Sequence, residues 1–202
     1  NFEKSKRKDI PLIPKTLNQE DMIDSLNDPS THVVVAYGSA GTGKTFIASH
    51  WAVKALYEGT VDKVVLIRPN IGCDDEQIGH LPGDVNEKMY SILSSIWDSL
   101  ELYYTKEEIE SLVNNGKIIP LPLAFVRGRS LANSCIILEE AQGTTPNSML
   151  AVLTRISTNS KLIITGDTKQ KDRRTTNGLE DLIDKLNDND IKGISHIEFN
   201  ES

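Results

Sequence analysis

The segment GSAGTGKT, from Gly38 to Thr45, constrains the fold of this chain more than any other feature. It matches the pattern G-x-x-x-x-G-K-[ST], in which glycines let backbone N–H groups surround phosphate oxygens. It follows the β-branched run HVVVAYG (32–38) and opens a stretch with helical spacing (45–59). A helix N-terminus adds partial positive charge that favours phosphate. The alternative, a plain glycine turn that feeds a helix, fits this context less well, so we predict a nucleotide site.

Within this loop, Lys44 is expected to reach the β- and γ-phosphates and the Thr45 hydroxyl to ligate Mg²⁺. Lys44 is thus both a catalytic and a nucleotide-binding candidate. The predicted nucleotide-binding residues of the loop are Gly38, Ser39, Ala40, Gly41, Thr42, Gly43, Lys44 and Thr45.

Strands and helices are expected to alternate along the chain. Predicted strands are 32–38, 63–69, 117–123 (within the extended segment 117–125), 135–140, 161–167 and 194–199, and predicted helices are 18–27, 45–59, 84–115, 146–156 and 178–187. Within 84–115, Thr105 and Glu108 form a plausible capping box that starts a second helix. Because most strands are almost continuously apolar, they indicate a mostly parallel sheet with helices on both faces, an α/β fold. The prolines in 117–125 favour a position near a sheet edge.

The length of 202 residues suits one domain. We expect an extended lead-in over residues 1–15 and a single P-loop ATPase domain over 16–202. The net charge of −7 argues against nucleic-acid binding over the whole surface but permits a local site. With no long apolar run, a transmembrane helix is not expected, and the protein should not act at a membrane. The two cysteines show no CxxC pattern, which favours a reducing cytoplasm.

The stretch CIILEEAQ (135–142) places two adjacent carboxylates at the end of a buried strand. Glu139 is expected on the Mg²⁺ side, through a water, and Glu140 is expected to orient and polarise the attacking water. Gln142 should support these groups without touching the ligand. Two predicted strands, 63–69 and 117–123, separate this stretch from the phosphate loop. Additional-strand ATPases of the RecA-like type have an intervening strand and a glutamate in the position of Glu140, so ATP hydrolysis is favoured over phosphoryl transfer to a small acceptor.

The stretch TGDTKQ (165–170) ends a further apolar strand. Gln170 is the candidate to contact the γ-phosphate or the attacking water. Asp167 can hold the loop that follows this strand, or it can support Mg²⁺ indirectly by contacting the groups that bind the ion. Taken alone, the Gly-Asp pair is an ordinary strand-to-turn signal; beside the other two motifs, the functional interpretation is favoured.

Together these motifs resemble the PhoH-like family of ATPases, whose domain is similar to the first motor domain of superfamily-one helicases. The resemblance covers nearly the whole chain. Its most particular parts are LPGD (81–84) with EK (87–88), and the RGR of LAFVRGRSL (123–131) followed by LEEAQGTTP (138–146). The remaining matches are PKTLNQ (14–19), the phosphate loop, IRPN (67–70), LTRI (153–156) and SKLIITGDTKQKD (160–172).

The resemblance implies further roles. Gln19 resembles a helicase glutamine whose amide pairs with adenine, with Asn18 assisting, which makes the nucleotide ATP. The alternative for Gln19 is a polar helix start. Arg68 resembles part of a motif that touches nucleic-acid backbone. Arg127 and Arg129 are candidates to contact phosphate, either of RNA or of a nucleotide in a neighbouring subunit, unless they form a structural salt-bridge loop.

A helicase uses two motor domains, and this chain has room for one. The resemblance therefore implies a ring, expected to be a hexamer, in which a neighbour supplies an arginine. The chain stops at FNES, about where the family continues into an arginine-bearing segment (roughly DVVRHP), so we expect a truncated C-terminus. If that arginine acts in trans, this chain would bind ATP but hydrolyse it poorly.

Three functions remain open. The first is ATP hydrolysis coupled to RNA or single-stranded nucleic acid. The second is a nucleotide-gated binding or assembly module with little turnover, which is motivated by Glu139 and by the expected missing C-terminal segment. This residue is one methylene longer than the aspartate usual in the family, so we expect ATP binding with an altered Mg²⁺ dependence. The third is a small-molecule kinase, for which no acceptor pocket or lid-like insertion stands out.

Overall fold

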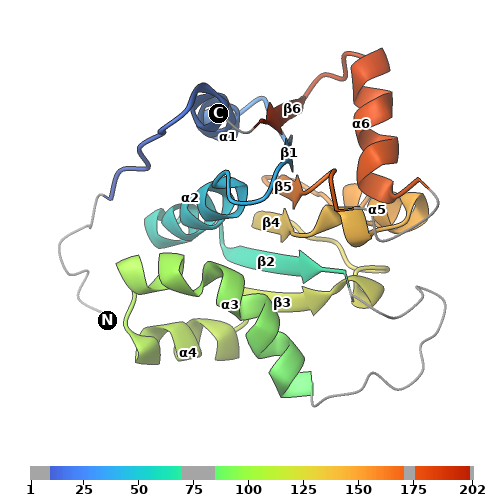
Figure 1. The fold of residues 1–202 in the computed structure, drawn as a ribbon. Coiled ribbons are helices and arrows are strands. Elements are labelled where there is room, and N and C mark those ends of the chain that lie inside the picture. The colour runs from blue at the N-terminus through green and yellow to red at the C-terminus, as the bar shows by residue number, and fades with distance from the viewer. Residues whose placement is uncertain (1–9, 70–84, 171–175, 201–202) are drawn as a thin grey trace.

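A single six-stranded sheet forms the centre of the molecule (Figure 1). The computed structural model describes residues 10–69, 85–170 and 176–200, with side chains from 91 onward in the second range. Every pairing within the sheet is parallel, and the strands lie in the order β3-β2-β4-β5-β1-β6. The strands are β1 (Val33–Gly38), β2 (Lys63–Arg68), β3 (Ile118–Pro122), β4 (Ser134–Leu138), β5 (Lys161–Gly166) and β6 (Ile194–Phe199).

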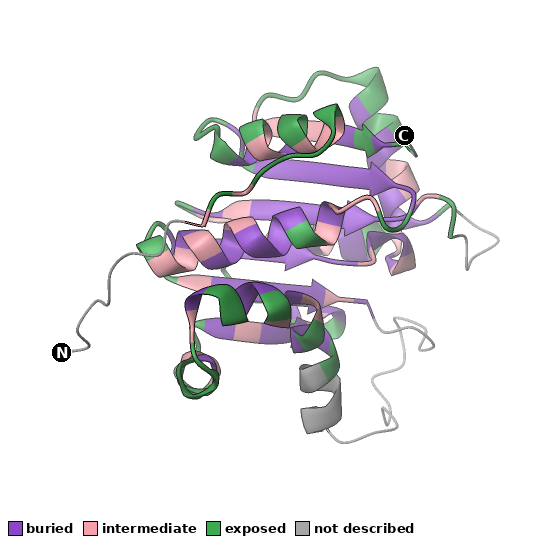
Figure 2. Ribbon diagram, turned by 60° about the vertical axis from the view of Figure 1, so that its left-hand side comes forward, coloured by how far each residue is buried: buried purple, intermediate pink, exposed green. Residues whose placement is uncertain are grey.

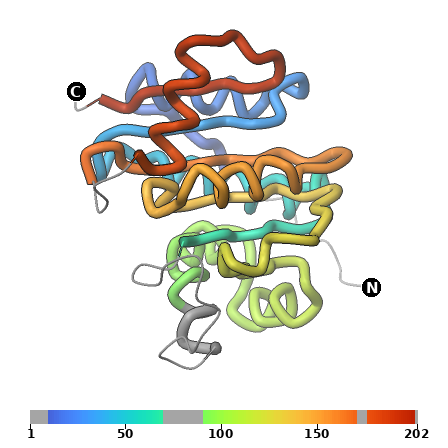
Figure 3. Tube along the Cα trace, turned by 90° about the vertical axis from the view of Figure 1, so that its right-hand side faces the viewer, coloured from blue at the N-terminus to red at the C-terminus, as the bar shows by residue number. Residues whose placement is uncertain are grey.

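Helices cover both faces of the sheet. They are α1 (Leu17–Asn27), α2 (Lys44–Glu58), α3 (Val85–Tyr103), α4 (Lys106–Asn114), α5 (Pro146–Leu153) and α6 (Gly178–Asp188), with short 3-10 turns η1 (Leu123–Phe125) and η2 (Ala141–Gly143). α1 to α4 pack on one face, and α5 and α6 pack on the other. Figure 3 views the molecule from the side that α5 and α6 cover. This confirms the predicted α/β class with two covered faces.

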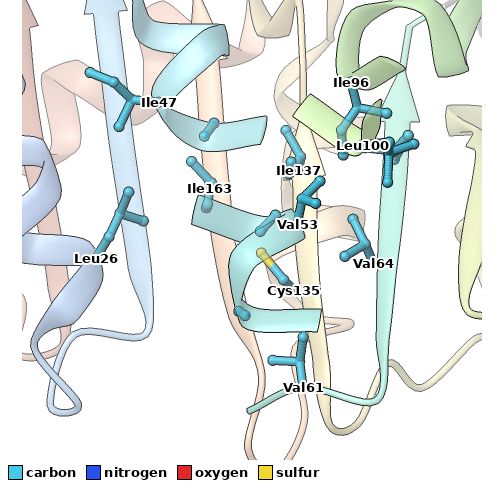
Figure 4. Packing of buried hydrophobic residues seen from close by; sticks show 14 of the residues in the cluster. Leu26, Ile47, Val53, Val61, Val64, Ile96, Leu100, Cys135, Ile137 and Ile163 are labelled. Carbon is cyan, nitrogen blue, oxygen red and sulfur yellow. The ribbon is translucent and has the colours of Figure 1, made fainter. Parts of the chain in front are cut away.

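Alternation along the strands divides the core into two clusters. In β4, Cys135 and Ile137 face α2 and α3, whereas Ile136 and Leu138 face α5 and α6. Figure 4 shows the first cluster, in which Ile137 lies among side chains from α2 and α3. All five residues of β4 are buried, and Figure 2 shows the same for most of the sheet. Burial on both faces explains why these strands read as continuous apolar runs.

The strand between the phosphate-loop strand β1 and the carboxylate strand β4 is β5. The sheet is therefore of the additional-strand type. However, the intervening strand comes later in the sequence than β4, and the two strands that precede β4 in sequence, β2 and β3, lie beyond it. The packing of each crossover connection decides which strands become neighbours, and the order of strands in the sequence does not fix this.

Most element boundaries agree with the predictions to within one or two residues. The 84–115 stretch divides into α3 and α4, and Thr105 and Glu108 form the predicted capping box. Strand β3 lies at a sheet edge, as its prolines indicated. Strand β4 ends at Leu138, so Glu139 and Glu140 lie beyond the strand rather than within it. The LPGD segment and the end of KQKD lie outside the described residues. None of the described helices is long and apolar enough to span a membrane.

Candidate nucleotide site

A cavity of about 330 Å³ opens at the carboxyl ends of β1 and β5 and at the N-terminus of α2. It is lined by Ala40, Gly41, Thr42, Gly43, Lys44, Thr45, Phe46, Glu140, Thr165, Gly166, Asp167 and Gln170. Nine of these twelve were candidate site residues in the sequence. Three separate motifs therefore meet at one end of the sheet, which is where parallel α/β sheets bind ligands.

Two positions of the loop require glycine because neighbouring atoms approach the backbone there too closely for a side chain. Gly43, at the start of α2, has a φ of 92°, and a Cβ there would lie 2.9 Å from Nε2 of Gln19. Gly38 has a φ of 124°, and a Cβ there would lie 2.1 Å from the carbonyl oxygen of Phe199 in β6. Since a side chain fits neither position, the loop can fold closely between α1 and the last strand.

Lys44 lies under the loop and is buried. Its Nζ donates to the carbonyl oxygens of Gly38 (3.1 Å) and Ser39 (2.6 Å), and lies 5.9 Å from the centre of the Phe199 ring. Burial lowers the pKa of the Lys44 ammonium group, and the charges of Asp167 and Glu140 oppose this shift. A cation surrounded by carbonyl groups at the base of a phosphate-sized cavity can exchange those contacts for phosphate oxygens.

Glu140 is the carboxylate of the CIILEE segment that lines the cavity. Its φ of 51° is in the left-handed region, which is uncommon for a residue other than glycine. The Gln142 amide donates to Oε2 of Glu140 (2.6 Å) and accepts from the Asp167 backbone N–H (3.0 Å). Gln142 does not line the cavity. It connects the segment after β4 to the segment after β5, which fits its expected supporting position.

Asp167 is buried, and its Oδ1 accepts the backbone N–H of Lys169 (2.8 Å). Of its two proposed tasks, holding the loop after β5 matches this contact. The loop it stabilises carries Gln170, which is exposed and lines the cavity.

Arg68 at the end of β2 has a contact that its expected nucleic-acid role did not suggest. Its Nη2 lies 3.8 Å from Oε1 of Glu140, and its Nη1 donates to the Ser91 carbonyl in α3 (3.4 Å). Both charged side chains are partly exposed, so the ion pair contributes little energy. It nevertheless places a cation beside the carboxylate predicted to activate water.

Glu139 lies near Ser95 of α3 and does not line the cavity. It is 4% exposed, and its Oε1 has no hydrogen-bond partner among the described residues. Burial raises the pKa of the Glu139 carboxyl group, while the side chain of Ser95 and the charge of Arg68 lower it.

The residues near the cavity fit Mg²⁺ as a partner of phosphate rather than as an ion held by protein alone. No group of three or more His, Cys, Asp or Glu side chains that could hold a metal ion is found in the described part of the chain. Mg²⁺ commonly keeps several waters and takes few protein ligands beside substrate phosphates. Thr45 lines the cavity, so its hydroxyl suits such an ion. Glu139 does not line the cavity and would reach the ion only through a water.

Gln19 and Asn18, the residues expected near adenine, do not line the cavity. The Gln19 amide donates to the carbonyl oxygen of Thr42 (3.0 Å), and its Oε1 accepts the backbone N–H of Lys15 (2.8 Å). Its amide therefore fixes the phosphate loop to the start of α1.

Arg127 and Arg129 are exposed in the turn after η1, beyond edge strand β3, and do not line the cavity. Strands β2, β4 and β5 lie between β3 and β1 in the sheet. The structure therefore does not bring these two arginines to the nucleotide cavity of their own chain.

Three lining residues were not singled out from the sequence. Phe46 directly follows the phosphate-loop pattern, and Thr165 and Gly166 precede Asp167. The place of Phe46 next to Thr45 was a usable signal. Gly166 contributes through its lack of a side chain, since a Cβ there would lie 2.5 Å from Leu179 and 2.9 Å from Oε1 of Gln142.

Sequence comparison finds proteins that are similar to this chain over most of its length. A family model described as PhoH-like protein matches residues 11–202. A PhoH-like protein of Synechocystis sp. is 41% identical over 158 residues, which cover 78% of this chain and 47% of that protein. A PhoH-like protein of Bacillus subtilis is 38% identical over 190 residues, covering 93% of this chain and 58% of that protein. The chain spans about half the length of the curated relatives it matches.

Comparison with solved structures finds the large terminase of a thermophilic bacteriophage, solved in complex with ADP. The TM-score is 0.55, with 13% sequence identity, over 92% of this chain and 45% of the terminase chain. A second crystal form of that terminase gives a TM-score of 0.54 at 12% identity, over 93% of this chain and 46% of the terminase chain. At this identity the likeness shows a shared fold alone.

Proposed function

The chain belongs to the PhoH-like protein family, and from this premise we propose that it hydrolyses ATP in work on RNA or single-stranded nucleic acid. The observation that carries the proposal is that Lys44, Glu140 and Gln170 line one cavity. A phosphate-binding cation, a candidate base and a γ-phosphate sensor are the groups that ATP hydrolysis needs together.

In this proposal the loop 38–45 holds the phosphates, and Lys44 turns from the loop carbonyls to the β- and γ-phosphates. Glu140 orients the attacking water, and Gln142 fixes the Glu140 carboxylate through their 2.6 Å hydrogen bond. Thr45, and Glu139 through a water, would hold Mg²⁺, which neutralises charge that develops on the phosphates. Gln170 reports whether the γ-phosphate is present.

The test is phosphate release by the full-length protein supplied with Mg·ATP, with and without single-stranded RNA. We expect turnover that rises when RNA is added, because nucleic-acid contact at Arg68 would act next to Glu140. A full-length protein that releases no phosphate with any nucleic acid would overturn the proposal.

We also propose a homo-oligomeric ring, expected to be a hexamer. Support comes from Arg127 and Arg129, which are exposed and do not line the cavity of their own chain. Their side chains are therefore open to a neighbouring subunit or to an RNA phosphate. The mass of the full-length protein in solution, with and without Mg·ATP, tests this; a monomer under both conditions contradicts it.

A nucleotide-gated module with little turnover is the second candidate. It is favoured by the position of Glu139, which is buried and does not line the cavity. It is also favoured by the ion pair in which Arg68 competes for the Glu140 carboxylate. Rapid turnover by the full-length protein that disappears on Glu140→Gln would exclude it.

The Glu139→Asp variant tests how Mg²⁺ is held. An aspartate is one methylene shorter and leaves more room for the water that bridges the carboxylate to Mg²⁺. We expect turnover to rise, or half-maximal activity to need less Mg²⁺, by about two- to tenfold, as for a change in one charge-assisted contact. The measurement is turnover against Mg²⁺ concentration. If both quantities stay unchanged, Glu139 is a tolerated replacement with no effect on the metal.

A further inference from the structure

Phe46 is an exposed aromatic residue at the rim of the nucleotide cavity. Its side chain is 54% exposed, whereas the next two residues of α2, Ile47 and Ala48, are buried. It lines the cavity beside Thr45 and is the sole aromatic side chain among the described lining residues. The mechanism proposed above gives this ring no task.

The ring of Phe46 is supported from below by a buried polar pair. It meets the His50 ring edge-on, with 5.7 Å between centroids and an interplanar angle of 90°. His50 is 3% exposed, and its Nε2 lies 3.0 Å from the Tyr103 hydroxyl, which donates to the Ile10 carbonyl oxygen. Burial lowers the pKa of His50, which favours the neutral imidazole. The Phe46 ring therefore packs against a buried, hydrogen-bonded histidine while about half of the residue stays exposed.

In the proposed site, the other lining residues serve the phosphates and the attacking water. These residues are the glycine loop with Lys44 and Thr45, and the side chains of Glu140, Asp167 and Gln170. The amide of Gln19 is committed to the Thr42 carbonyl and the Lys15 N–H. A nucleotide whose phosphates lie in the loop needs an apolar surface for its base, and an aromatic ring offers one through stacking.

We propose that the Phe46 ring is the platform on which the base of the bound nucleotide stacks, so that this residue contributes affinity for nucleotide over bare polyphosphate. The inference rests on the proposed nucleotide site and adds the surface that holds the base. Stacking uses the face of the base, so it serves adenine without requiring an amide to read its edge.

A single exposed apolar residue is ordinary and proves nothing alone. Leu150 of α5 is similarly exposed, at 59%, and does not line the cavity. It supplies a matched control, since its truncation to alanine removes a similar apolar surface at a site with no proposed ligand.

The experiment is calorimetric titration of the full-length protein with Mg·ADP and, separately, with Mg·tripolyphosphate, which has no base. Phe46→Ala should weaken Mg·ADP binding by about 5- to 100-fold, the range of one base–aromatic stack. Tripolyphosphate binding should change by less than about twofold, because the phosphate loop is untouched. Phe46→Tyr should bind ADP like the wild type, and Leu150→Ala should change neither affinity.

Phe46→Trp provides a second readout. Stacking should quench the fluorescence of the introduced indole when Mg·ADP is added, and tripolyphosphate should not. Unchanged ADP affinity in Phe46→Ala, or equal weakening of both ligands, overturns the inference, since the ring would then be idle or merely support the loop. A wild-type protein that binds tripolyphosphate but not ADP overturns it as well. Failure of the wild type to bind either ligand overturns the proposed nucleotide site itself.

Discussion

Replacing Glu140 by glutamine should lower ATP turnover by about 10²–10⁴-fold, the usual contribution of a general base. Affinity for Mg·ATP should stay within a few-fold of the wild type. Glutamine keeps an oxygen that can accept the Gln142 hydrogen bond, so the side chain can remain in place while losing its ability to polarise water. Turnover and equilibrium nucleotide binding, measured on the same protein, separate the two effects.

The matched control is Glu110→Gln, which removes a carboxylate from the exposed surface of α4. It should leave both turnover and binding unchanged, since surface substitutions away from such sites have small effects. Full turnover in Glu140→Gln would show that another group activates the water. Loss of binding in that variant would show that the carboxylate holds the nucleotide instead.

Replacing Lys44 by methionine should weaken Mg·ATP binding by about 10²-fold, as expected for removing charge-assisted hydrogen bonds to phosphate. Methionine keeps most of the apolar length that lies near the Phe199 ring, so the loss reports mainly on charge. The measurement is the dissociation constant for Mg·ATP at fixed ionic strength, because salt screens charge contacts.

Lys54→Met on the same helix is the control, because Lys54 forms a partly exposed pair with Glu58 and does not line the cavity. It should bind Mg·ATP like the wild type. Equal affinity in Lys44→Met would mean that the loop carbonyls keep Lys44 away from the ligand, which would contradict the proposed site.

The sequence predicted the helices and strands of this fold well because the pattern of apolar residues in each segment reflects how that segment is buried. The apolar runs around Val34 and Ile137 are buried on both faces, and Gly59, the last residue of the predicted helix 45–59, caps α2 in a left-handed conformation. The spatial order of the strands in the sheet was harder to predict from the sequence. The strand between β1 and β4 is set by how the crossovers pack, and β5 follows β4 by more than twenty residues in the sequence.

The sequence predicted which residues would lie together where one motif supplies one group. Lys44, Glu140 and Gln170 do meet at one cavity. A supporting position was expected for Gln142, but the particular partners of Gln142 and Arg68 were not predictable, because side-chain direction decides them. Gln142 connects Glu140 to Asp167, and Arg68 lies near Glu140 because β2 and β4 are neighbours. Glu139 and Glu140 point in different directions because β4 ends at Leu138 and Glu140 takes a left-handed backbone conformation, with a φ of 51°, which a strand pattern does not predict.

The most direct test of the central claim is a crystal structure of the protein with Mg²⁺ and a non-hydrolysable ATP analogue. We predict the triphosphate in the loop 38–45, Mg²⁺ on the Thr45 hydroxyl, and a water between the γ-phosphate and Glu140. An analogue bound elsewhere, or phosphates in the loop with Glu140 unable to reach a water beside them, would contradict the account.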